Sequence, residues 1–505
     1  MRKIIFLFLF TTSAIFSQTT YFNIQFDYGS IWNTTFGIVE TDSQYLASGV
    51  FAAPLIFDTG YVLQITKSGD VSGIRKIDFY PGSKLRDIQL CPTQEGTVDV
   101  YGIHHTGFDD VASVDLFLCR LNEFTLDTIL VNSFGIPNFG DYSPNLMLRT
   151  SGNGIVITGY QFTPTATIQK LLLLKCDSQF NQVYLKTYSK SSTGLHSGYG
   201  AVETPGKGFI IVGSRSFNQY DRQGTYLRVD SLGNQIWWKD IVPQGDEEFI
   251  VFHDIVRLEN GAYLVLGIKQ YFNPGFPRYM VHLILSINEE GEVLWSKEYG
   301  SDIYNDAGWR GLTLCLDGNY ITGGTTRENQ YIPNRKAYGT IAKISPSGEV
   351  LWERKYSAST EGQLYDVFWR TIPTSDGGFI CAGSTWGDSI TKENSWIVKL
   401  DSLGCLEPGC DSISTGVVEL PVGDNSPIKI YPNPTGGQLT IEAQGGRLIT
   451  ALKVYDLQGH RLKDETYKPG RDSLSLDMSG DPPGMYFCTA LVGGVWVTRQ
   501  FILKN

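Results

Sequence analysis

The sequence predicts an all-β fold class, and three observations support this prediction. A short β-rich phrase ending in glycine occurs seven times, with its last glycine at 49, 102, 159, 213, 267, 324 and 383. The steps between these residues, called the anchor glycines below, are 53, 57, 54, 54, 57 and 59 residues. Short apolar runs separated by Gly, Asn, Asp and Ser turns surround each one, without sustained helical periodicity. A fixed period of this size, with four short strands in each repeat, predicts a seven-bladed β-propeller.

The N-terminal residues predict an export signal. Arg2 and Lys3 form a basic start, residues 4–10 form an apolar core, and small residues at 13–17 place cleavage before Gln18. The apolar core is too short to span a bilayer, and no other segment approaches about 18 apolar residues. We therefore expect residues 1–17 to be a signal peptide and the mature protein to have no transmembrane segment.

Residues 18–410 are predicted to form the propeller. The seventh repeat has a third strand at 395–400 but no fourth strand after it. The segment 21–29 has the pattern of that missing outer strand. If the N-terminal segment supplies it, the ring closes without a ragged edge between the first and the last blade.

Three repeats share the pattern Gly-X-X-(Leu/Ile)-Trp. The copies run from Gly233 to Trp237, from Gly291 to Trp295 and from Gly348 to Trp352. The pattern resembles the tryptophan-docking repeat of quinoprotein-like propellers, which implies that each tryptophan packs between adjacent blades. Quinoprotein dehydrogenases have a vicinal cysteine pair and more blades, and this chain has neither, so no cofactor is predicted.

The composition indicates which partners the protein can bind and whether its cysteines form disulfides or bind metal. The formal charge is −11, or −13 once the two cations of the signal peptide are removed, which disfavours nucleic-acid binding. Of the eight cysteines, Cys405 and Cys410 are closely spaced around a Pro-Gly turn and are expected to form a disulfide. The other six lie in or beside strand runs, where small buried apolar side chains are expected. No metal-binding motif is present, and no metal is predicted.

The repeat pattern of the sequence ends after Cys410. Residues 411–427 contain Ser, Gly, Pro and Asp without a repeat and are interpreted as a linker. Residues 428–505 contain six or seven short alternating segments, which predict a small Ig-like β-sandwich.

Three motifs in this C-terminal segment occur in a fixed order. They are Tyr-Pro-Asn-Pro-Thr-Gly-Gly at 431–437, Val-Tyr-Asp-Leu-Gln-Gly-His at 454–460, and Leu-Asp-Met-Ser followed by Pro-Gly-Met-Tyr-Phe at 476–487. Their characteristic positions are Tyr431, Pro432, Asn433, Pro434, Gly436, Tyr455, Asp456, Gly459, Gly484 and Tyr486. Together they resemble the type A C-terminal sorting domain of the type IX secretion system of Bacteroidetes-type bacteria. His460 departs mildly from the basic residue that usually follows the glycine.

The resemblance implies partners and a location. The chain would pass the inner membrane by its signal peptide and the outer membrane by the type IX machinery. A sortase-like protease would then remove the domain, with cleavage expected in the linker. The product would be secreted or fixed to the outer cell surface.

The loops at strand starts contain the candidate ligand contacts of the propeller. The aromatic candidates are Trp32, Tyr304, Trp309 and Trp369, and the acidic ones are Asp87, Asp254, Asp306 and Asp366. Aromatic faces beside convergent polar groups suit a carbohydrate. In the alternative interpretation, the aromatics are blade-packing core and the aspartates form turns.

The sequence therefore favours a surface or secreted binding or adhesion module for a carbohydrate or protein ligand, and no catalytic residue is assigned. A glycan-active hydrolase or lyase using carboxylates on the propeller face is the first alternative. A structural surface protein without a small ligand is the second.

Overall fold

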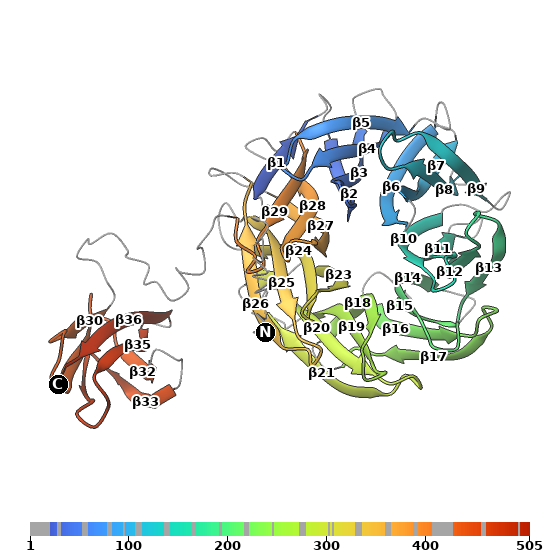
Figure 1. The fold of residues 1–505 in the computed structure, drawn as a ribbon. Coiled ribbons are helices and arrows are strands. Elements are labelled where there is room, and N and C mark those ends of the chain that lie inside the picture. The colour runs from blue at the N-terminus through green and yellow to red at the C-terminus, as the bar shows by residue number, and fades with distance from the viewer. Residues whose placement is uncertain are drawn as a thin grey trace, which may run out of the picture. The chain divides into compact units, whose positions relative to one another are not determined.

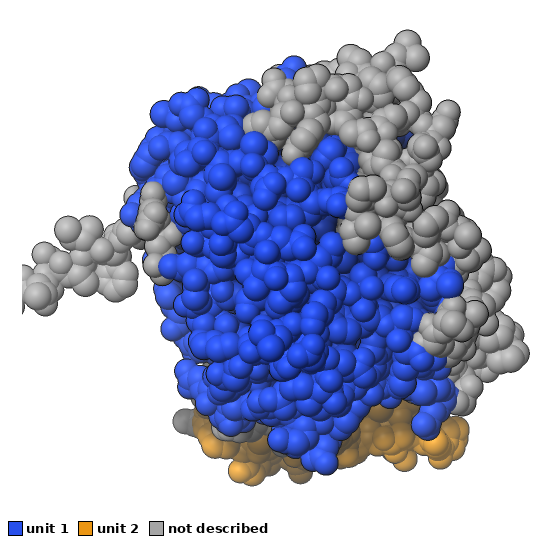
Figure 2. Space-filling model, turned by 90° about the vertical axis from the view of Figure 1, so that its right-hand side faces the viewer, with its two compact units in different colours: residues 1–408 blue, residues 409–505 orange. Residues whose placement is uncertain are grey.

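The chain divides into two compact units, Met1–Pro408 and Gly409–Asn505, which Figure 2 distinguishes by colour. In both units the described residues form strands, turns and bends without a helix (Figure 1). The computed structural model describes residues 21–27, 32–52, 59–77, 83–93, 96–106, 114–135, 142–162, 168–190, 194–216, 222–244, 247–271, 279–300, 304–305, 308–328, 336–358, 365–386, 392–406, 428–455, 461–492 and 495–504. The predicted signal peptide and linker lie outside these residues.

The first unit is a ring of seven four-stranded blades, which confirms the predicted propeller (Figure 1). Blade 1 comprises β2 (Trp32–Glu40), β3 (Gln44–Ala52), β4 (Thr59–Thr66) and β5 (Val71–Ile77). Blade 2 comprises β6 (Ser83–Pro92), β7 (Thr97–Thr106), β8 (Val114–Asn122) and β9 (Thr128–Phe134). Blade 3 comprises β10 (Tyr142–Arg149), β11 (Ile155–Phe162), β12 (Ile168–Cys176) and β13 (Gln182–Tyr188). Blades 4 and 5 comprise β14 (Gly194–Glu203), β15 (Phe209–Ser216), β16 (Arg222–Val229), β17 (Gln235–Ile241); and β18 (Glu247–Arg257), β19 (Tyr263–Tyr271), β20 (Tyr279–Ile287), β21 (Val293–Tyr299).

Blade 6 differs because its innermost strand is split. Its strands are β22 (Tyr304–Asn305), β23 (Trp309–Leu314), β24 (Tyr320–Glu328), β25 (Ala337–Ile344) and β26 (Val350–Tyr356). Blade 7 contains β27 (Asp366–Pro373), β28 (Phe379–Thr385) and β29 (Asn394–Leu400), and its fourth strand is β1 (Phe22–Phe26).

The N-terminal strand closes the ring as the sequence predicts. β1 pairs antiparallel with β29, from Phe22 opposite Lys399 to Phe26 opposite Ser395. Its apolar residues alternate with exposed ones and pack against the core between blades 7 and 1. The Trp396 indole N–H also donates to the Asn23 side-chain oxygen at 2.7 Å. The first and last segments of the propeller are therefore held together by backbone, apolar and polar contacts.

Aromatic residues on the outer strands pack against the turn of the following blade. A Cβ placed on the turn glycine of the next blade would meet the tryptophan ring at 2.4–2.9 Å. The pairs are Trp237 with Gly291, Trp295 with Gly348 and Trp352 with Gly404. Phe22 of β1 takes the same place against Gly69 of blade 1, at 2.6 Å. The three tryptophans thus connect adjacent blades, as the docking motif predicts, and β1 continues the series across the closure.

The anchor glycines face the innermost strands, where backbones approach closely. A Cβ on Gly213 would lie 1.9 Å from the Ser197 carbonyl oxygen of β14. Equivalent Cβ atoms on Gly49, Gly267, Gly324 and Gly383 would lie 1.8–2.4 Å from a carbonyl oxygen of the neighbouring inner strand. No side chain fits at that distance, so glycine is needed there for space.

The described cysteines agree in part with the expected disulfide and the expected buried cysteines. Cys405 is disulfide-bonded, and Cys410 lies outside the described residues. The other six cysteines are free, and all but the partly buried Cys91 are buried.

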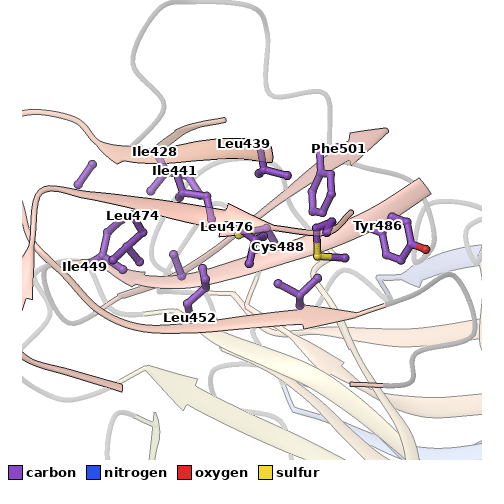
Figure 3. Close-up of a cluster of buried hydrophobic side chains, with 14 of the residues drawn as sticks. Ile428, Leu439, Ile441, Ile449, Leu452, Leu474, Leu476, Tyr486, Cys488 and Phe501 are labelled. Carbon is purple, nitrogen blue, oxygen red and sulfur yellow. The ribbon is translucent and has the colours of Figure 1, made fainter. Parts of the chain in front are cut away.

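The second unit consists of two facing antiparallel sheets, which confirms the predicted β-sandwich. One sheet has β30 (Ile428–Tyr431), β31 (Gln438–Ala443) and β34 (Ser473–Asp477). The other has β33 (Arg461–Arg471), β32 (Ile449–Tyr455), β35 (Gly484–Val492) and β36 (Val495–Leu503). Ile441, Leu452, Leu476 and Phe501 belong to the apolar cluster that the two sheets enclose (Figure 3).

The residues of the first sorting motif are tied to the last strand of the sandwich. The Thr435 N–H donates to the Ile502 carbonyl oxygen at 2.8 Å, and the Lys504 N–H donates to the Thr435 carbonyl oxygen at 2.8 Å. The Asn433 side-chain oxygen accepts the Ile502 N–H at 2.9 Å. The first motif and the closing strand β36 are therefore hydrogen-bonded neighbours, although about 70 residues separate them in the sequence.

Candidate functional site

A β-bulge interrupts the innermost strand of every blade. In β2 the register shifts between Thr35 and Gly37, which leaves Phe36 without a partner on β3. The other shifts lie between Arg86 and Gln89, Pro144 and Leu146, Gly198 and Gly200, Phe252 and Asp254, Arg310 and Thr313, and Phe368 and Arg370. A bulge re-aims the extra residue out of the regular alternation of the strand. The close approach at the anchor glycines accompanies these bulges.

Four aromatic bulge residues line one cavity of about 380 Å³. They are Phe36 of blade 1, Tyr199 of blade 4, His253 of blade 5 and Trp369 of blade 7. The remaining blades contribute Gln89, Leu146 and Arg310. The inner strands of the seven blades lie around the centre of the ring (Figure 1). Because residues of all seven strands line it, the cavity lies at that centre.

Aromatic rings occur in neighbouring pairs around this central cavity. The rings of Phe36 and Trp369 have centroids 5.7 Å apart, and those of Tyr199 and His253 are 5.9 Å apart. The guanidinium carbon of Arg310 lies 4.3 Å from the centroid of the Trp369 ring. Burial, reinforced by Arg310, lowers the pKa of His253 to about 3, so its imidazole is neutral at physiological pH.

Arginine side chains and one aspartate make up the charged part of the cavity. Arg310, Arg370 and Arg222 line it together with Asp254. A Cβ on Gly311, a residue at φ +74°, would lie 3.3 Å from Arg370 Nη1 and 3.7 Å from Asp254 Oδ2. Arg370 and Asp254 therefore converge on the same glycine.

The Asp254 carboxylate is fixed by backbone amides. Its Oδ1 accepts the Ile255 N–H at 2.8 Å, and its Oδ2 accepts the Leu312 N–H at 2.7 Å. Burial raises the pKa of Asp254, while the Leu312 hydrogen bond and the Arg370 charge oppose that rise. The side chain thus links β18 to β23 across two blades.

Two of the eight ligand candidates from the sequence, Asp254 and Trp369, line the central cavity. Trp309 and Asp366 are fully buried elsewhere. The Trp309 ring stacks on His282 with centroids 3.8 Å apart and an interplanar angle of 4°. Asp366 Oδ2 accepts hydrogen bonds from the Ser357 hydroxyl and the Ala358 N–H, both at 3.0 Å. Both side chains are thus enclosed within the packing of the blades.

The other four candidates are not brought to the cavity by any described contact. Trp32 is 55% exposed at the start of β2, where its backbone bridges to Glu393. The backbones of Asp87 and Tyr304 belong to β6 and β22, and their side chains are outside the description. Asp306 lies outside the described residues.

The sequence reasoning missed Phe36, Tyr199, His253, Arg310 and Arg370. A signal for most of them exists in the spacing from the anchor glycine. Tyr199, His253, Arg310 and Trp369 each precede their anchor glycine by 14 residues, and Phe36 precedes its own by 13. Once the bulge is known, the cavity-lining residue of an inner strand can be found 13 or 14 residues before the anchor glycine of its blade.

The described residues contain no group of three or more His, Cys, Asp or Glu side chains arranged to hold a metal ion. The same residues also include no helix that is long and apolar enough to cross a membrane.

Comparison with known proteins identifies the C-terminal unit. Residues 429–504 match the family described as Secretion system C-terminal sorting domain. The chain therefore ends in a sorting domain of type IX secretion, which indicates secretion to the cell surface or outside. No curated protein matches the chain.

Similarity to solved structures is at the level of fold. A protein of unknown function from Dyadobacter fermentans has a TM-score of 0.42 at 9% identity, covering 63% of this chain and 96% of that one. An ulvan lyase has a TM-score of 0.44 at 9% identity, covering 78% and 100%. An α-L-arabinanase from Penicillium chrysogenum in complex with arabinobiose has a TM-score of 0.40 at 12% identity, covering 73% and 94%.

Proposed function

We propose that the propeller is a carbohydrate-binding module that type IX secretion delivers to the outer cell surface or the medium. The observation that carries the proposal is the central cavity, which all seven blades line and in which aromatic rings and polar groups from six of them converge. Ligand sites combine apolar walls with a few placed polar groups, and aromatic rings offer flat apolar faces to sugar rings. A volume of about 380 Å³ suits a chain end or a short segment of a glycan.

We further propose the export route that the sequence predicts. Residues 1–17 act as the signal peptide, and a sortase-like protease cleaves within 411–427. The mature product would then retain residues 18–410 with the cavity intact.

A glycan-active hydrolase or lyase is the first alternative, and the described carboxylates do not favour the hydrolase. Hydrolysis normally requires two carboxyl groups that flank the scissile bond. Among the described cavity residues only Asp254 provides one, and both of its oxygens accept backbone N–H groups. Asp366, the other acidic candidate from the sequence whose side chain is described, is fully buried.

The proposal is tested by passing the purified chain over a panel of immobilised polysaccharides and assaying released sugar in the same run. We expect retention on at least one polysaccharide without released sugar. Tyr199→Ala should weaken that retention about tenfold, because it removes an aromatic wall of the cavity. Phe124→Ala is the matched control, since Phe124 is 59% exposed on the turn between β8 and β9.

Released sugar would contradict the proposal in favour of an enzyme. Absence of both retention and release would contradict it in favour of a protein partner or a structural role. Equal loss of retention in the two variants would show that the cavity is not the site.

A further inference from the structure

We infer that the ligand of the central cavity is an anionic glycan, whose carboxylate or sulfate group binds between Arg310 and Arg370. This inference rests on the proposed function and specifies the chemical class of the ligand.

The described lining of the cavity is cationic, although the whole protein is acidic. The chain has a formal charge of −11, yet the described lining contains three arginines and one carboxylate. A concave site lined by one sign of charge attracts ligands of the opposite sign. An acidic protein with a cationic cavity therefore selects anions at that position.

The guanidinium groups of Arg310 and Arg370 lack anionic partners among the described residues. Arg310 contacts the face of Trp369, and its buried Nε has no hydrogen-bond partner. Arg370 forms no hydrogen bond or ion pair within the described part of the chain. Elsewhere in the propeller, three partly buried arginines have carboxylate partners: Arg120 and Arg149 bind Asp99, and Arg215 binds Asp240.

Leaving a guanidinium group without a partner in a half-buried site is costly. Burial disfavours the charged form, and it lowers the pKa of Arg310. An oxyanion entering the cavity would restore both the charge balance and the missing hydrogen bonds. Charge-assisted hydrogen bonds from arginine to an oxyanion are short and strong, and the planar donor fork can bind two oxygens at once.

Asp254 does not fill this role. Its two oxygens accept the Ile255 and Leu312 N–H groups, and it makes no ion pair within 4 Å with Arg370 among the described contacts. The Arg370 charge acts on Asp254 only through space. The donors of both arginines thus remain available to a ligand.

The rest of the cavity fits the sugar ring that would carry the anion. Phe36 and Trp369 provide apolar surface next to Arg310. Across the ring, Tyr199 and the neutral imidazole of His253 can donate to or accept from hydroxyl groups. Carboxylate and sulfate groups share the oxyanion chemistry, so the experiment below separates them.

The test uses the purified chain and pairs of polymers that differ only in charge. Polygalacturonate is compared with its fully methyl-esterified form, and dextran sulfate is compared with dextran. We expect at least one acidic polymer to bind about tenfold or more tightly than its neutral counterpart, with affinity falling as salt is raised. The acidic polymer that binds identifies carboxylate or sulfate as the recognised group.

Arginine variants locate the effect. Arg370→Gln and Arg310→Gln should each weaken binding of the acidic polymer about 10- to 100-fold, the usual effect of losing a charge-assisted hydrogen bond. Arg370→Lys should give an intermediate loss, because the charge remains while the planar fork is lost. Arg75→Gln is the matched control, because it removes the same charge from β5, which lies on the outside of blade 1. Urea unfolding of each variant would show that the fold is retained.

Equal binding of acidic and neutral polymers would overturn the anionic assignment while leaving glycan binding intact. Binding of no polymer would overturn the proposed function and this inference together. Loss of acidic binding in Arg75→Gln equal to that in Arg370→Gln would also overturn the inference, because the charge effect would then be diffuse.

Discussion

Single glycines allow neighbouring strands of a blade to approach closely. Gly213 lies opposite the bulge of β14, where a Cβ would be 1.9 Å from the Ser197 carbonyl oxygen. We predict that Gly213→Ala lowers the free energy of unfolding by about 2–3 kcal/mol, since the backbone must shift to relieve the overlap. Urea denaturation followed by tryptophan fluorescence measures the change.

The matched control for this prediction is Gly206→Ala, in the turn that precedes β15, the strand that contains Gly213. No heavy atom lies within 4 Å of the Cβ that alanine would add there. We expect a change within about 0.5 kcal/mol, as for most exposed substitutions. Similar losses in the two variants would mean that the close approach is not what makes the anchor glycine necessary.

At the scale of elements, the propeller depends on the strand that closes it. β1 contributes Ile24 to the core between blades 7 and 1, while Gln25 on the other face is exposed. We predict that Ile24→Asp lowers the free energy of unfolding by about 3 kcal/mol, because it places a charge against buried apolar side chains. Hydrogen exchange should also become faster in β29, which is the pairing partner of β1.

Gln25→Asp introduces the same charge on the exposed face of the same strand. It removes only the hydrogen bond from the Gln25 amide to the Ala358 carbonyl oxygen. We expect a loss below about 1 kcal/mol. If both variants were equally stable, the apolar face of β1 would not be responsible for closing the ring.

The strands were predictable because the information that specifies them repeats. Seven spaced glycines indicated the blades, the missing fourth strand indicated the role of β1, and the tryptophan pattern indicated the contacts between blades. The cavity residues were less accessible, because a bulge breaks the period-2 alternation from which side-chain direction is inferred. Tyr199 and His253 therefore look like ordinary strand residues, whereas the aromatic and acidic pattern pointed equally to the buried Trp309 and Asp366.

For the whole molecule, the central cavity and the sorting domain lie in different units of the chain. The cavity belongs entirely to the first unit, and residues 429–504 of the second match the sorting family. The local motifs of the second unit were predictable because they have a fixed order. Their physical connection was not, because it depends on Asn433 and Thr435 reaching the backbone of β36.

The division into two units predicts that location and ligand binding can be uncoupled. We expect a chain lacking residues 429–505 to accumulate in the periplasm of its host, because the address of the outer-membrane step is removed. Cell fractionation with immunoblotting measures the location, and the polysaccharide assay applied to the periplasmic material measures the binding. A complementary fusion, with residues 411–505 following an exported reporter protein, should bring that reporter to the cell surface or the medium. Surface delivery of the truncated chain at the level of the full chain would contradict the assignment of the second unit as the sorting signal. Loss of binding in correctly folded truncated protein would show instead that the second unit takes part in the site.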